Sequence, residues 1–264
     1  LGGYRGHPNA YWKSYMGWLT QSQIAVARGD MSLTLAPYEK PTTGVQVLQV
    51  PIGLDQKGKS VAYWFEYRME PPRDLETGEV LDLGWNRDRL KVWVNLPSIP
   101  GDLVQGGRSM IRDSRVFSFV FGAGPGSAHV RAGGCFREVY RGFQVCRGEN
   151  EGEKATVTVE LSKLAVEPAI GHEMAPGGRK TVTVANTGTV PVKLGAFSIE
   201  GRDATLFSIV ASTCNDTPLP PGGVCTVQVE YALTVDRSLR SAHLTATTND
   251  PLRRVIVVGL HGII

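Results

Sequence analysis

The sequence predicts a mainly β protein with one short N-terminal helix, a β-rich accessory region and a C-terminal immunoglobulin-like β-sandwich. Two observations predict this class. Short stretches that alternate apolar and polar residues run through most of the chain, and clusters of glycine, proline and asparagine separate them. In the last ~100 residues these stretches recur at the spacing that is typical of an immunoglobulin-like sandwich.

The opening of the chain carries the expected helix. Asn9 is a suitable N-cap, and Gly17 with Trp18 is expected to end the helix. Apolar residues recur at three- and four-residue intervals and form one predicted face: Tyr11, Trp12, Tyr15, Met16 and Leu19.

Alternating strands follow the helix. We expect them at residues 31–35, 45–50, 61–68, 90–96, 116–121, 128–131, 143–146 and 155–161. The stretch 61–68 is bulky on both faces, so it belongs inside a sheet. Glu66 and Arg68 lie on the same side of it, where a partly buried ion pair is expected. Nothing beside this pair suggests chemistry, which favours a structural role.

A second set of strands follows a boundary near residues 161–168. These strands are expected at 180–185, 192–199, 207–211, 225–231, 241–247 and 254–260. A chain of 264 residues exceeds what one core usually organises, so we divide it into three parts. The predicted parts are a helix with strands, a β-rich accessory region and the sandwich: 1–68, 69–163 and 164–264.

Four cysteines form two closely spaced pairs, Cys135 with Cys146 and Cys214 with Cys225. This spacing suits two local disulfides, each inside one domain, although four cysteines allow three connectivities. Reduced thiols in a cytosolic protein are the alternative. A zinc knuckle is disfavoured because no Cys-x-x-Cys spacing occurs. Disulfides would place the chain in an extracellular, secreted or cell-surface setting.

Charge and hydropathy exclude two classes of partner. The formal net charge is +3, and the basic residues are scattered among acidic ones, so no nucleic-acid partner is expected. No run approaches the roughly 18 apolar residues of a membrane span. Leu1 is not a natural initiator, so we expect the sequence to begin after a removed signal or within a longer precursor.

No catalytic residue, metal ligand or cofactor site is expected in this chain. A hydrolytic zinc site needs two histidines four residues apart with a glutamate between them, and the sequence lacks that motif. The stretch 171–174, Gly-His-Glu-Met, begins like it, but Pro176 stands where the second ligand would be, so we interpret the stretch as a linker or turn. No Gly-x-Ser-x-Gly elbow occurs either.

Residues 164–264 resemble the choice-of-anchor D type of immunoglobulin-like domain. The resemblance rests on Phe197–Phe207, on Cys214, on Leu219–Cys225, on Thr248-Asn249-Asp250-Pro251 and on the closing Gly259–Gly262. It implies an interaction or spacer module of surface and secreted proteins, without catalysis.

Residues 1–160 resemble the C-terminal portion of gametolysin-like secreted zinc metallopeptidases. The landmarks are Gly2-Gly3, Asn9–Lys13, Gly17–Leu19, Leu33–Tyr38 and Tyr63–Arg68. In that family this portion follows the zinc helix and its methionine turn, and it continues into a β-rich accessory region. The zinc helix would lie upstream of residue 1, so no ligand or catalytic glutamate carries over.

Three functions are compatible with these observations. The first is a non-catalytic extracellular binding or assembly protein related to the C-terminal part of a secreted metallopeptidase, with another extracellular protein or subunit as partner. The second is the processed non-catalytic chain of an active metallopeptidase. The third is a carbohydrate-binding module. Five tryptophans are candidate recognition aromatics if they are exposed, with core positions as the alternative: Trp12, Trp18, Trp64, Trp85 and Trp93.

Overall fold

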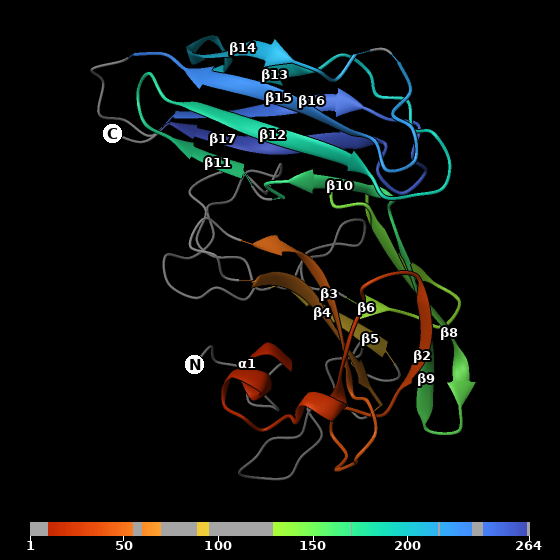
Figure 1. The fold of residues 1–264 in the computed structure, drawn as a ribbon. Helices are drawn as coiled ribbons and strands as arrows, with labels where there is room; N and C mark the ends of the chain where they lie inside the picture. Colours follow the sequence, from red (N-terminus) through yellow and green to blue (C-terminus); the bar gives the residue numbers. More distant parts are fainter. Residues whose placement is uncertain are drawn as a thin grey trace.

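The structure confirms the predicted fold class, since the residues that it describes are mainly β with one short α-helix (Figure 1). The computed structural model describes residues 10–54, 60–69, 89–94, 129–169, 171–215, 217–233 and 240–262. The expected strand 116–121 lies outside these residues. The expected strands 90–96 and 128–131 correspond in part to strand β5, Arg89–Val94, and strand β6, His129–Val130.

Strands of the N-terminal half form two sheets. The first has the order β1-β3-β4-β5-β6, and the second has the order β2-β9-β8-β7. Their strands are β1 Ile24–Val26, β2 Met31–Leu35, β3 Val47–Leu54, β4 Ser60–Arg68, β5 Arg89–Val94, β6 His129–Val130, β7 Cys135–Glu138, β8 Phe143–Glu151 and β9 Lys154–Leu161.

Strand β4 is the centre of this half because both of its faces are covered. One face contributes Tyr63 and Phe65 to a core shared by the two sheets, where both rings meet Phe143 edge-on at centroid distances of 5.0 and 6.3 Å. The opposite face contributes Trp64 to a smaller cluster that includes Ala10 of the helix. The bulky residues on both faces of β4 therefore have a packing reason, as the sequence predicts.

The C-terminal half is a sandwich of two four-stranded sheets, with the orders β10-β12-β15-β14 and β11-β17-β16-β13. One hydrophobic core lies between them. The strands are β10 Leu164–Glu167, β11 Gly171–Met174, β12 Arg179–Asn186, β13 Ser198–Glu200, β14 Phe207–Ser212, β15 Val224–Tyr231, β16 Arg240–Thr247 and β17 Val255–Gly262. In β15 every second residue is buried, the pattern that identifies a sandwich strand in sequence.

The N-terminal helix is shorter than expected. Helix α1 spans Ala10–Tyr15 and ends in a Schellman motif, in which Trp18 N–H donates to Lys13 O and Gly17 N–H donates to Ser14 O. Gly17 takes the left-handed φ of 73° that this motif requires. The predicted apolar face is therefore wrong for Tyr15 and Met16, which are 75% and 40% exposed.

Two stretches of the sandwich differ from their predictions. Residues 192–199 make only isolated bridges before β13 begins, because Pro191 lacks a donor and Gly195 weakens strand pairing. The stretch 171–174, predicted as a linker or turn, is strand β11 and pairs in parallel with β17. A Cβ at Gly171 would lie 2.6 Å from Gly259 O, so only glycine permits this close approach of the two strands.

The turn after β16 joins the two halves. Asp250 Oδ2 accepts hydrogen bonds from Ser162 Oγ at 2.8 Å and from Lys163 N–H at 3.1 Å. The buried Arg253 donates to Leu164 O at 3.1 Å and to Arg141 O. These contacts assign a physical role to the landmark at residues 248–251, which holds the connection between the halves.

The predicted division of the chain stays a prediction. Strands from both sides of residue 68 share sheets and one core, whereas the core changes near residue 163. Ala169 comes after that boundary in the sequence but belongs to the N-terminal core. It lies so close to Gly53 that a Cβ added there would be 2.5 Å from the Ala169 side chain.

Candidate interaction site at the N-terminal helix

Described residues from three of the segments behind the predicted metallopeptidase resemblance meet around one buried carboxylate. Glu66 of β4 is fully buried, and its Oε2 accepts the Ala10 N–H at the start of α1 at 2.8 Å. Its Oε1 accepts Arg68 Nε at 2.7 Å and lies 2.6 Å from Arg68 Nη2. The expected ion pair thus exists, but it is buried on both sides rather than partly buried. It fixes the beginning of α1 to the strand.

The ring of Tyr38 contacts two cations at the same site. Lys13 Nζ is 3.8 Å from the centre of the Tyr38 ring and donates to Tyr38 O at 3.3 Å, and Arg68 Cζ is 5.0 Å from the same ring. These distances are those of cation–π contacts. Burial lowers the pKa of Lys13 and raises the pKa of Tyr38.

Arg68 is held charged by its carboxylate neighbours. Burial alone would lower its pKa, but Glu66 and then Glu39 outweigh burial, and the net direction is upward. Glu66 and Arg68 thereby satisfy each other's charge, and Glu66 also accepts the Ala10 N–H, which favours the structural role that the sequence predicts for the pair. Across the described ranges, no group of three or more histidine, cysteine, aspartate or glutamate side chains has metal-binding geometry.

Glu39 makes this cluster sensitive to pH. Burial raises the pKa of Glu39, and the attraction of Arg68 offsets only part of that shift. The folded chain then binds the proton more tightly than the unfolded chain, so stability falls as the pH rises from the ordinary carboxyl pKa through the raised one. We expect Glu39→Gln to have a higher Tm than the wild type at about pH 7 and the same Tm at about pH 4. Thermal melts at both pH values check this, and an equal difference at both would contradict the carboxyl as its origin.

Past the contact between Ala10 and Glu66, which anchors the helix, the end of α1 and the turn after it form an exposed surface. This surface is called here the aromatic tip and is defined by Tyr15, Met16 and Trp18. Trp18 is 61% exposed, whereas the adjacent Leu19 is buried in the cluster with Trp64. The Schellman turn causes this reversal, since it swings the chain out of the helical period after Tyr15. Helical spacing alone therefore does not predict that the tip is exposed, although Gly17 indicates where the helix ends.

The five candidate tryptophans do not form one surface. Trp18 is exposed and belongs to the aromatic tip. Trp64 is a core residue, which was the alternative for these tryptophans, because α1 covers its face of β4. Trp85 and the side chains of Trp12 and Trp93 lie outside the described residues.

Both local cysteine pairs are joined in the structure. Cys135–Cys146 links β7 to its neighbour β8 at directly opposite positions. Cys214–Cys225 links the beginning of the loop after β14 to strand β15. Each half of the protein thus contains one disulfide, as the local pairing requires. Such bonds persist in oxidising compartments.

Removing the second disulfide should weaken the sandwich alone. We expect Cys214→Ala with Cys225→Ala to lower its unfolding free energy by about 3 kcal/mol, because the cross-link restricts the unfolded chain. Hydrogen exchange followed by mass spectrometry resolves the effect by segment, with β12 losing protection and β4 keeping it. Cys135→Ala with Cys146→Ala is the matched control and should show the opposite distribution. Loss of protection in both halves from either double variant would contradict independent bridges.

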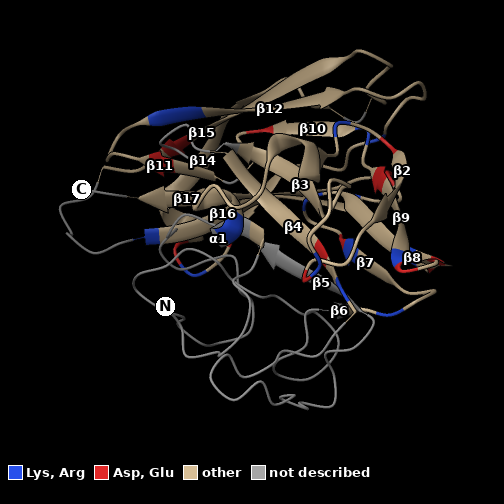
Figure 2. Cartoon of the chain, turned by 90° about the horizontal axis from the view of Figure 1, so that it is seen from below, with Lys and Arg blue, Asp and Glu red and all other residues tan. Residues whose placement is uncertain are grey.

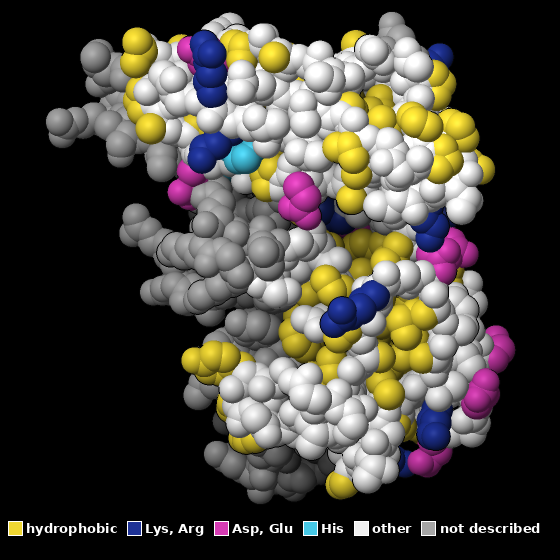
Figure 3. Space-filling model, in the orientation of Figure 1, with side chains coloured by type: hydrophobic (Ala, Val, Ile, Leu, Met, Phe, Trp, Pro, Cys, Tyr) yellow, Lys and Arg dark blue, Asp and Glu magenta, His cyan; other side chains and the backbone are white. Residues whose placement is uncertain are grey.

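Surface charge does not single out a charged partner. Basic and acidic residues alternate over the described elements (Figure 2). On the face shown in Figure 3, hydrophobic side chains extend over both halves with isolated charged residues between them. Among the described residues, no helix has the length and apolar character that crossing a bilayer requires.

Fold and site together define a two-part β protein with a disulfide in each part and an anchored helix that ends in exposed aromatics. No protein-family profile and no curated protein matches the sequence. Among solved structures, the secreted serine protease VesC from Vibrio cholerae aligns over 44% of this chain and 28% of its own, at 17% identity and a TM-score of 0.32.

Two further solved structures show similar partial likenesses. The VesB protease of Vibrio cholerae aligns over 46% of this chain and 41% of its own, at 12% identity and a TM-score of 0.30. The ASH/PapD-like domain 7 of human CEP192 aligns over 38% of this chain and 84% of its own, at 14% identity and a TM-score of 0.26. The alignments thus span less than half of either Vibrio protease. The gametolysin and choice-of-anchor D resemblances stay predictions.

Proposed function

We propose that this chain is a non-catalytic extracellular binding or assembly module, related to the C-terminal part of a secreted metallopeptidase. The aromatic tip of α1 is the observation that carries the proposal. Tyr15 and Trp18 are large side chains with few rotatable bonds, and exposed aromatics of this kind are the residues that most often dominate protein interfaces. Two cysteine bridges support the extracellular setting.

The buried cluster supports the proposal by holding the tip in place. A six-residue helix is too short to be stable alone, so its position depends on the contacts of Ala10 with Glu66 and of Lys13 with Tyr38. A surface fixed before binding loses less conformational entropy when a partner arrives. The anchor therefore makes the tip an efficient contact surface.

The resemblance to gametolysin-like peptidases favours an alternative partner for the same surface. In that family the segment matching α1 follows the zinc helix and the methionine turn. The chain would then be the non-catalytic chain of an active peptidase, and its tip would contact the catalytic chain. A carbohydrate ligand is the third possibility for exposed aromatics, and the experiment below separates the three.

Photo-cross-linking from the tip tests the proposal. The full chain carrying benzoylphenylalanine at Met16 is illuminated in extracellular fluid of its source, and the adduct is identified by mass spectrometry. We expect one discrete protein adduct that unlabelled wild-type chain competes away and Trp18→Ala chain does not. The matched control carries the cross-linker at Val190, which is 64% exposed in the sandwich. Equal labelling from both positions would contradict the tip as a binding surface.

Zinc analysis and a casein-digestion assay test the non-catalytic part of the proposal. We expect no stoichiometric zinc in the dialysed chain and no proteolysis. One zinc per chain with EDTA-sensitive proteolysis would overturn this part. If the cross-linked protein is a peptidase, the result would support the non-catalytic chain of an active peptidase. If adding soluble polysaccharide abolishes the adduct, the result would support a carbohydrate-binding module.

A further inference from the structure

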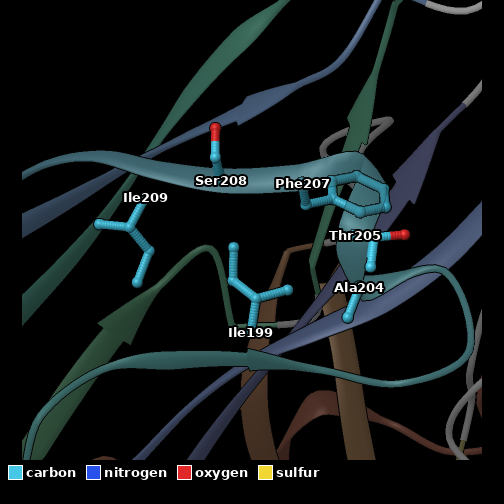
Figure 4. Close-up of a pocket in the computed structure, with 6 residues that line it drawn as sticks. All are labelled: Ile199, Ala204, Thr205, Phe207, Ser208 and Ile209. Atoms are coloured by element: carbon cyan, nitrogen blue, oxygen red, sulfur yellow. The ribbon is translucent and has the colours of Figure 1, made fainter.

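The sandwich has an apolar pocket on the side where the chain crosses from one sheet to the other. A 3₁₀ turn at Ala204–Leu206 makes this crossing between β13 and β14. The pocket is an open hollow of about 370 Å³ in the surface, and it is lined by Ile199, Ala204, Thr205, Phe207, Ser208 and Ile209. Figure 4 shows Ile199 and Ile209 projecting into the space between the two strands, while the Ser208 hydroxyl points away from it.

Strand β14 forms an unprotected edge beside this pocket. It pairs with β15 on one side, and in the described part of the chain no strand pairs with its other side. Its sequence, Phe-Ser-Ile-Val-Ala-Ser, contains no charge and no proline. Natural sheet edges are usually blocked by such residues, and the other three edges of the sandwich each carry a glutamate: Glu167 in β10, Glu173 in β11 and Glu200 in β13.

A bulge in β14 brings an apolar side chain to the surface. Ile209 faces Val229 and Ala211 faces Gln228, so Val210 is the extra residue, and it is 39% exposed. The edge therefore combines backbone positions that no described strand pairs with, an exposed valine and a pocket beside it. These are the parts that strand addition uses: main-chain hydrogen bonds for affinity and a pocket for alternate side chains.

We propose that this β14 edge binds an extended segment of a partner protein, apolar at alternating positions and uncharged where it crosses the pocket. A small molecule fits the site poorly, because the only lining side chains with polar atoms are the hydroxyls of Thr205 and Ser208 and the site is wide open. A second copy of this chain paired through these six residues would meet it over a contact about 20 Å long and about 5 Å wide, which is far less than the roughly 800 Å² per partner that a stable dimer buries. An extended segment needs only the main-chain positions of the edge and the pocket beside it.

This surface is independent of the aromatic tip. Figure 1 shows β14 at the opposite end of the molecule from α1. The inference thus goes beyond the proposed function, and a variant of each surface serves as the control for the other.

A selection with random peptides tests the proposal. Phage-displayed twelve-residue peptides are selected on the immobilised full chain, and the selected sequences are synthesised and titrated. We expect peptides with alternating apolar residues that protect the amides of residues 207–212 from hydrogen exchange. Val210→Lys should weaken their binding at least about tenfold, because lysine blocks an open edge. Val190→Lys, at another exposed valine, and Trp18→Ala should leave binding unchanged.

Several results would overturn the proposal. They are a failure to select any peptide, protection outside residues 207–212, or equal binding by Val210→Lys chain that melts cooperatively. Sedimentation showing a dimer that Val210→Lys dissociates would assign the edge to a second copy instead. Loss of peptide binding in Trp18→Ala would show that the peptides engage the aromatic tip, which separates failure of this inference from failure of the proposed function.

Discussion

Replacing Glu66 with alanine is expected to lower the free energy of unfolding of the N-terminal half by about 3–5 kcal/mol. The change removes a fully buried carboxylate and leaves Arg68, which is also buried, without the ion-pair partner that it contacts at 2.6 Å, so that of the two carboxylates only Glu39 still acts on its charge. It also removes the acceptor of the Ala10 N–H and so detaches the start of α1. Urea unfolding followed by tryptophan fluorescence measures the effect, since all five tryptophans lie in the first hundred residues.

The exposed pair Lys40–Glu153 is the matched control. Its 2.7 Å separation is nearly that of the buried pair, but its side chains are 37% and 64% exposed. Glu153→Ala should therefore cost only about 0–1 kcal/mol. Burial, and not the ion-pair distance, is the reason for the difference.

Two further variants keep this prediction testable if Glu66→Ala does not fold. Glu66→Gln retains an acceptor for the Ala10 N–H and should be less destabilising than Glu66→Ala. Glu66→Leu combined with Arg68→Met removes both charges and should be more stable than Glu66→Leu alone. A double variant less stable than the single one would contradict the unpaired buried charge as the main cause of the destabilisation.

Replacing Arg253 with alanine is expected to cost about 2–4 kcal/mol and to split unfolding into two transitions. Arg253 is 9% exposed and lies at the connection between the two halves, called here the joint. It donates hydrogen bonds to Leu164 O of the sandwich and to Arg141 O of the N-terminal half. Its loss leaves both buried carbonyls without this donor and removes the side chain that packs beside Gly142. Calorimetry measures the number of transitions and their temperatures.

Arg254→Ala is the control for the joint, because this neighbouring arginine is exposed. It should leave the melting profile unchanged. A single unshifted transition in Arg253→Ala would contradict the joint as a coupling element. The fragment 164–264 provides a second test, since its separate core predicts a cooperative melt by itself.

The strands can be predicted from the sequence because the alternation of apolar and polar residues is a local property. In a strand, side chains two residues apart lie on the same face, so the sequence alone places Glu66 and Arg68 together. The cysteine pairs can be predicted for the same reason, since each disulfide closes a short loop. The end of α1 can be predicted only in part. Gly17 indicates where the helix ends, but it does not indicate that Tyr15 is exposed.

Long-range packing decided the rest. Strand β11 depends on its parallel partner β17, almost ninety residues away in the chain, and no local pattern in Gly-His-Glu-Met contains that information. The burial of Glu66 depends on α1, and the role of Asp250 depends on Ser162 across the joint. The open edge at β14 exists only because of the order of strands in its sheet. The sequence by itself therefore determined the β class, the local ion pair and the local cysteine pairs, whereas the tertiary structure decided which residues are buried, joined or exposed, since those properties depend on neighbours distant in the chain.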